Sequence, residues 1–119
     1  MRQKILIVDD EPDLVATCVR LLAPRGYLCL RAHTAREAVV LIDAERPDLV
    51  LADFHLPDLD GLNVLTHARA MTPPVPGILM TADGSARTVQ RAYDTGGISY
   101  LPKPFSASRL IEAVDLALR

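Results

Sequence analysis

The sequence of 119 residues lacks the features of a membrane protein, a secreted protein or a strongly basic protein. No apolar run reaches the roughly 18 residues that a membrane span needs. A run of only four apolar residues, Ile5–Val8, precedes Asp9-Asp10, too few for the core of a secretory signal peptide. Lys and Arg number 13 against 15 Asp and Glu, a net charge of −2, which argues against nucleic-acid binding through bulk positive charge. We therefore expect a cytoplasmic protein that binds neither nucleic acid nor membranes directly.

Cysteine is also scarce, with Cys18 and Cys29 the two occurrences. Both lie in apolar segments, where small buried thiols are common. We expect reduced core residues of a cytosolic protein, and the alternative is a disulfide or a redox role. Half of the residues are apolar and 24% are charged, an ordinary composition for a globular domain. The length predicts one domain, spanning residues 1–119.

Short apolar runs alternate with amphipathic segments along the whole chain. Continuous apolar runs are typical of strands buried on both faces of a parallel sheet, and helical spacing marks the segments between them. Five strands alternating with five helices predict an α/β fold, a doubly wound parallel sheet with helices on both faces. The expected strands span residues 4–8, 27–32, 48–52, 78–80 and 98–101. The expected helices span residues 12–22, 34–46, 62–70, 85–94 and 106–118.

Polar side chains follow four of these strands, at the edge where open α/β sheets bind ligands. They are, in chain order, Asp9 and Asp10, Asp53, Thr81 and Lys103. Three neighbouring carboxylates repel one another unless a cation lies among them, and Mg²⁺ prefers such oxygen ligands. A carboxylate can also be the nucleophile in phosphoryl transfer, where a metal, an ammonium and a hydroxyl surround the transferred group. The strand ends therefore predict a Mg²⁺ site for phosphoryl transfer, with Asp53 the carboxylate that takes the phosphoryl group.

The motifs around these residues resemble those of the receiver domain of bacterial response regulators. They are ILIVDDEP, LVLADFHLPDLDG, MTADG and SYLPKPF, in that order. The resemblance spans the whole chain and implies the flavodoxin-like strand order 2-1-3-4-5. It also implies a signalling module of a two-component system, which catalyses only its own phosphorylation and dephosphorylation and is not an enzyme with an external substrate.

In a receiver domain, Asp53 would take a phosphoryl group from a histidine kinase or a phosphotransfer protein. Asp10 would bind Mg²⁺ directly, Asp9 would act mainly through water, and the backbone carbonyl of His55 would be a further ligand. Lys103 would bind a phosphoryl oxygen. The same resemblance makes the peptide bond that follows this lysine, to a proline, a cis bond.

Thr81 and Tyr100 resemble the switch pair of the family. The threonine hydroxyl moves to the phosphoryl group, and the aromatic ring turns inward behind it. The surface formed by the helix over 85–94, the strand containing Tyr100 and the last helix would then control an output domain or a partner protein. His55 and Asp83 stand where the family tunes dephosphorylation, and a solvated Asp83 is the alternative.

Other functions fit the sequence less well. Aspartyl phosphatases with a similar sheet typically carry D-x-D after the first strand, whereas Asp9 and Asp10 are adjacent here, and 119 residues leave no room for an inserted cap domain. A nucleotide- or flavin-binding domain needs a glycine-rich phosphate loop, and neither G-x-G-x-x-G nor G-x-x-x-x-G-K occurs. A receiver-like domain that no longer takes phosphate is disfavoured by the complete acidic set with Lys103.

Several properties stay open at this stage. The sequence identifies neither the kinase, the output, the phosphorylation lifetime nor the oligomeric state, although a homodimer is one option. The abrupt end of the last helix favours an excised N-terminal receiver over a stand-alone regulator. We expect Asp58 and Asp60 to shape the turn before Gly61. Arg87 and Arg91 lie four apart on one helix face, where a solvated face is favoured over a partner contact.

Overall fold

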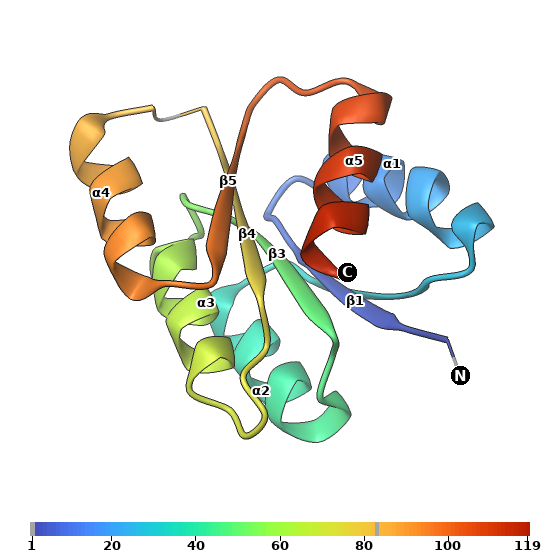
Figure 1. Ribbon diagram of the computed structural model, residues 1–119, viewed down its shortest axis with the longest axis horizontal. Helices are drawn as coiled ribbons and strands as arrows, with labels where there is room; N and C mark the ends of the chain where they lie inside the picture. Colours follow the sequence, from blue (N-terminus) through green and yellow to red (C-terminus); the bar gives the residue numbers. More distant parts are fainter. Residues whose placement is uncertain (1, 83) are drawn as a thin grey trace.

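The computed structural model describes residues 2–82 and 84–119, so Asp83 lies outside the described residues (Figure 1). Five parallel strands form one sheet in the order β2-β1-β3-β4-β5. This confirms the predicted doubly wound arrangement and its strand order. The strands are β1 (Lys4–Val8), β2 (Leu28–Ala32), β3 (Leu49–Asp53), β4 (Gly77–Thr81) and β5 (Ile98–Pro102).

Helices cover both faces of the sheet, with α1 and α5 on one side and α2 and α3 on the other (Figure 1). Each predicted helix and strand is present, and its ends lie within one residue of the predicted ones. The helices are α1 (Pro12–Leu22), α2 (Ala35–Glu45), α3 (Gly61–Arg69), α4 (Ala86–Thr95) and α5 (Ala107–Ala117). A short 3₁₀ helix, η1 (Ala23–Arg25), follows α1. Within the described residues, no helix has the length and apolar character to cross a bilayer.

The three central strands are buried on both faces, as their continuous apolar sequences predict. All residues of β3 and β4 are buried, and β1 is buried from Ile5 onward. Alternate side chains of each strand point to opposite faces and join one of two apolar clusters. Because apolar side chains cover both faces of the sheet, the polar side chains that could carry a function lie at the strand ends.

The two cysteines are not joined in a disulfide. Cys18 is buried on α1, and Cys29 on β2 is partly buried. Burial, followed by the nearby charge of Asp9, raises the pKa of the Cys18 thiol to about 11. The thiol is therefore protonated at neutral pH and has little nucleophilic character.

Asp58 has a second role besides the turn expected from the sequence, in which the Leu59 N–H donates to its Oδ1 at 3.1 Å. Its carboxylate oxygens accept hydrogen bonds from the backbone N–H groups of Ala35 (2.9 Å) and Arg36 (3.0 Å), in the first turn of α2. These N–H groups have no partner within their own helix, and a negative charge is favourable at this end. The hydrogen bond from Ala35 is the main reason why the pKa of Asp58 lies below its ordinary value. Asp58 therefore ties the β3–α3 loop to α2 as well as turning the chain.

Replacing Asp58 should destabilise the fold in a pH-dependent way. Because the folded pKa is lowered, the stabilisation is present above the ordinary carboxyl pKa of about 3.9 and is lost as the pH falls through the folded value. We expect Asp58→Ala to lower the urea midpoint at pH 7, followed by circular dichroism, with a smaller decrease near pH 3. The exposed Asp94→Ala is the control. A decrease of equal size at both pH values would contradict this account.

Candidate functional site

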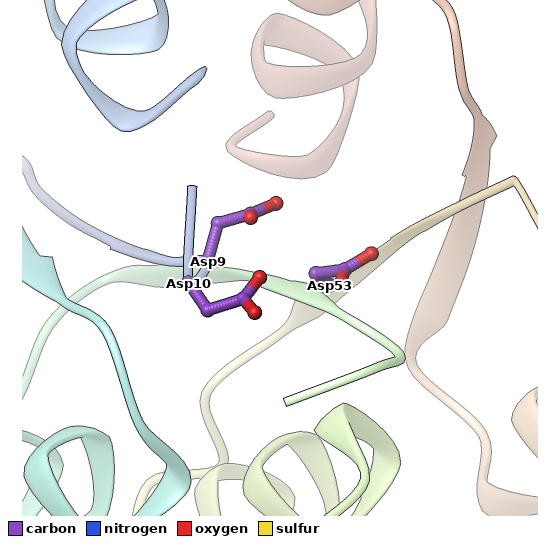
Figure 2. A group of neighbouring side chains, drawn as sticks. All are labelled: Asp9, Asp10 and Asp53. Atoms are coloured by element: carbon purple, nitrogen blue, oxygen red, sulfur yellow. The ribbon is translucent and has the colours of Figure 1, made fainter. Parts of the chain in front are cut away.

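Three carboxylates meet at the carboxyl edge of the sheet, as the strand-end pattern predicts. Asp9 and Asp10 follow β1, and Asp53 is the last residue of the neighbouring strand β3. One oxygen of each lies within 4.8 Å of the others. Figure 2 shows the Asp9 and Asp10 side chains extending from the end of β1 toward the side of Asp53. Asp10 is exposed, whereas Asp9 is fully buried and Asp53 is 6% exposed. The cluster thus combines one solvated carboxylate with two desolvated ones.

Lys103 provides the compensating positive charge. Its Nζ atom lies 2.7 Å from Asp9 Oδ2 and 3.2 Å from Asp53 Oδ1, and more distantly 3.9 Å from Glu11 Oε1. Burial lowers the pKa of Lys103, but the hydrogen bonds and charges of Asp9 and Asp53 outweigh it, so the pKa is raised overall. The side chain is 15% exposed and remains an ammonium ion at neutral pH.

The backbone around Lys103 fixes where this ammonium lies. The Lys103 N–H donates to the Thr81 carbonyl oxygen at 3.0 Å, which extends the pairing of β5 with β4 beyond the strand ends. The Lys103–Pro104 peptide bond is cis, which confirms the prediction. The lysine therefore starts from the end of β5 and reaches across β4 to carboxylates on β3 and β1.

The buried environment of Asp53 disfavours the ionised form of its carboxyl group. Burial raises the pKa of Asp53, the nearby Lys103 lowers it, and the charge of Asp9 raises it again, with a net shift upward. One lysine shared between two buried carboxylates therefore does not fully compensate Asp53. A second cation beside Asp53 would make its ionised form more favourable.

Gly61 packs directly against the backbone of Asp53, which sequence analysis did not foresee. Its N–H donates to the Phe54 carbonyl oxygen at 2.7 Å, and a Cβ atom on Gly61 would lie 1.8 Å from the Asp53 carbonyl oxygen. Only glycine allows this approach. Asp60, the preceding residue, caps α3 by accepting the Asn63 N–H at 3.0 Å. The Asp-Gly pair in the sequence indicates the start of a helix, but it does not reveal that the glycine packs against the Asp53 backbone.

Thr81 is the last residue of β4, and Tyr100 lies in the middle of the adjacent strand β5, in register with Leu79. Thr81 is fully buried, and the Tyr100 hydroxyl lies 3.5 Å from the Thr81 carbonyl oxygen. The Tyr100 ring is partly buried against the apolar cluster on the side of the sheet covered by α2 and α3. The structure thus brings this pair together, and their switch role stays a prediction.

His55, two residues after Asp53, has an exposed side chain. Its ring lies edge-on to the Phe54 ring, with the centroids 5.0 Å apart and the planes at 86°. His55 and Asp60 form an isolated antiparallel bridge across the loop. Among the described residues, the clustered metal-ligating side chains are Asp9, Asp10 and Asp53. The metal-ligand role of the His55 carbonyl stays a prediction.

A mainly apolar pocket of about 300 Å³ opens beside Lys103, between α1 and the β5–α5 connection. It is lined by Glu11, Leu14, Ala82, Lys103, Pro104 and Phe105. The pocket gives a second molecule room to lie next to the ammonium that contacts Asp53.

Removing the Asp53 charge should stabilise the metal-free protein. Because the folded pKa of Asp53 is raised, its ionised form is less favourable in the folded chain than in the unfolded one. We expect Asp53→Asn to raise the urea midpoint at pH 7 in the presence of EDTA. The gain should vanish below the ordinary carboxyl pKa of about 3.9, where both states are protonated. A lower midpoint for Asp53→Asn at pH 7 would contradict this electrostatic account, and Asp94→Asn is the exposed control.

Sequence comparisons place the chain among known signalling proteins. Residues 5–115 match the family model described as the response regulator receiver domain. The chain is 32% identical to sporulation initiation phosphotransferase F of Bacillus subtilis, and the match covers 96% of this chain and 92% of that protein. It is 36% identical to the nitrogen assimilation regulatory protein NtrX of Azorhizobium caulinodans, with 99% of this chain but 26% of that protein covered.

The solved structures agree. The receiver domain protein (CheY-like) of Methanospirillum hungatei superposes with a TM-score of 0.94 at 30% identity, covering 99% of this chain and 94% of that one. The chain spans about a quarter of the NtrX relative and 24% of the DNA-binding transcriptional regulator NtrC of Proteus hauseri, to which it is 31% identical. With the fold, the strand-end carboxylates and these relatives in agreement, the chain belongs to the response regulator receiver domain family, the signalling modules of two-component systems.

Proposed function

We propose that Asp53 is the phosphoacceptor of this receiver domain, which spans residues 1–119, and that the reaction depends on Mg²⁺. The observation that carries the proposal is the position of Asp53: a nearly buried carboxylate at the sheet edge, 3.2 Å from the Lys103 ammonium and clustered with Asp9 and Asp10. Carboxylates with this combination of metal ligands and a fixed ammonium suit phosphoryl transfer.

The donor set fits Mg²⁺. Two oxygens bound to one octahedral Mg²⁺ lie at most about 4.2 Å apart, so the observed spread of up to 4.8 Å needs a small side-chain rotation or a bridging water. Asp9 is already engaged, with Oδ2 on Lys103 and Oδ1 accepting the Glu11 N–H at 3.0 Å. Asp10 and Asp53 would therefore hold Mg²⁺ directly and Asp9 mainly through water, and the resemblance to the family adds the His55 carbonyl as a further ligand. When bound, Mg²⁺ neutralises the carboxylates and the oxygens of the incoming phosphoryl group.

The chain's own residues supply the remaining chemistry. An oxygen of Asp53 forms a bond to phosphorus while the bond from phosphorus to the donor breaks, giving an acyl phosphate. Lys103 moves from the Asp53 carboxylate to a phosphoryl oxygen, a short displacement because it already contacts Asp53. The Thr81 hydroxyl, at the end of the adjacent strand, donates to another phosphoryl oxygen.

A change at Asp53 reaches the surface through Thr81 and Tyr100. The phosphoryl group adds about −1.5 to −2 charge, and a hydroxyl that bonds it in one state only shifts the population of two states. Tyr100 fills the space behind the threonine and thereby changes the surface of α4, β5 and α5. Exposed apolar side chains on α4, Val89 and the 81% exposed Tyr93, give this surface contacts for a partner.

The partners follow from this arrangement. A histidine kinase or a phosphotransfer protein places its phosphoryl group at Asp53 and lies over the pocket beside Lys103. The α4–β5–α5 surface controls an output domain or a separate protein, and a homodimer through this surface is one form of that control. The domain itself is cytoplasmic and makes no direct contact with nucleic acid. His55 is placed to influence the rate of dephosphorylation.

The test is phosphorylation by a small-molecule donor. With Mg²⁺ and acetyl phosphate, we expect one phosphoryl group per chain, stable in acid and labile in base, located on Asp53 by mass spectrometry. Without Mg²⁺ the adduct should be lost, and Asp10→Asn should reduce its rate of formation at least tenfold. Asp94→Asn, an exposed aspartate on α4, is the matched control. An adduct that persists at the same site in Asp53→Asn would contradict the assignment.

A further inference from the structure

Arg91 on α4 contacts the loop that follows the β3 strand. Its Nη2 atom lies 3.3 Å from Asp60 Oδ2, and its guanidinium carbon lies 5.9 Å from the centroid of the Phe54 ring. A guanidinium over an aromatic face and beside a carboxylate is attracted by both. Arg91 remains 46% exposed, as the solvated face expected from the sequence predicts, but it also makes this contact within the chain. The side chain joins two elements that lie far apart in the chain.

Both partners of Arg91 are rigidly attached to the phosphoacceptor. Phe54 follows Asp53 directly, and its N–H donates to the Met80 carbonyl oxygen at 3.1 Å. Its carbonyl oxygen accepts the N–H of Gly61, the residue packed against the Asp53 backbone. Asp60 uses its other oxygen, Oδ1, to cap α3. A displacement of the loop around Asp53 therefore displaces the ring and the carboxylate that hold Arg91.

The rest of α4 is held by few contacts. Thr88 and Ala92 are the buried residues of this helix, whereas Val89 and Tyr93 are exposed. The helix lies beside β5, the edge strand of the sheet (Figure 1). Elements with little buried apolar surface open and shift most readily. The contact of Arg91 therefore adds to the packing of Thr88 and Ala92 in holding α4 in its position.

We propose that Arg91 is a positioning residue that couples α4 to the phosphoacceptor loop. It holds α4 in the position seen here, and a rearrangement around Asp53 reaches α4 through Phe54 and Asp60, in parallel with the proposed switch pair. The inference rests on the proposed phosphoacceptor function. It adds a second connection between the acceptor and the output surface, one made by a side chain of α4 itself.

Hydrogen exchange of the α4 amides tests this coupling. Exchange over residues 86–95 is measured by mass spectrometry with and without Mg²⁺ and acetyl phosphate. In Arg91→Ala we expect α4 to exchange several-fold faster before phosphorylation, and the change caused by phosphorylation to be at least halved. Arg87→Ala, one turn away on the same exposed face, is the control and should behave as wild type.

The variant Asp60→Asn tests the same contact by changing the residue that faces Arg91. Asparagine remains a good helix N-cap, so α3 keeps its cap while the charge that faces Arg91 is lost. We expect this variant to reproduce the effect of Arg91→Ala on α4, and the double variant to resemble either single variant because the two side chains act through one contact. Additive effects in the double variant would overturn the proposal.

Two further outcomes are decisive. If α4 in Arg91→Ala responds to phosphorylation as fully as in wild type, the residue stabilises the helix without coupling it, and the proposal is wrong. The mass of each sample reports its phosphorylation. A missing adduct in wild type would overturn the proposed phosphoacceptor function, whereas an adduct with an unchanged α4 response in Arg91→Ala would overturn the coupling alone.

Discussion

The contact of the Lys103 ammonium with Asp9 and Asp53 is the interaction on which the site depends. Two buried carboxylates at the ends of adjacent strands would repel each other and destabilise the sheet edge if no cation lay between them. The strand order makes the arrangement feasible, because β1 and β3 are neighbours and Lys103 reaches them from β5 across β4. One lysine shared between two carboxylates leaves the pKa of Asp53 raised. A metal ion is a cation that can relieve this residual imbalance.

The loop between β3 and α3 connects this site to three helices. Asp58 ties it to the start of α2, Gly61 locks it to the Asp53 backbone, and Asp60 joins it to both α3 and Arg91 of α4. The fixed contacts on the α2 and α3 side make the loop a stable base for the acceptor. Of the residues of α4, only Thr88 and Ala92 are buried, so movement is expected to cost least on this side.

Much of this could be predicted from the sequence, because the signals were local. Continuous apolar runs located the central strands, and the residue at each strand end, such as Asp53, located the site. The roles of Asp58 and Arg91 could not be predicted in this way. Their partners, the Ala35 backbone N–H and the Asp60 carboxylate, lie 23 and 31 residues away, and a contact between separate elements leaves no periodic pattern in the chain.

The most direct test of the electrostatic account is the affinity for Mg²⁺ when Lys103 is replaced. The ammonium and the metal ion are both cations that interact with the Asp53 carboxylate, so they oppose each other. The chain has no tryptophan, and calorimetry is therefore the suitable measurement. In Lys103→Met, which keeps the side-chain length, the account predicts tighter Mg²⁺ binding than in wild type. Unchanged or weaker binding would contradict it.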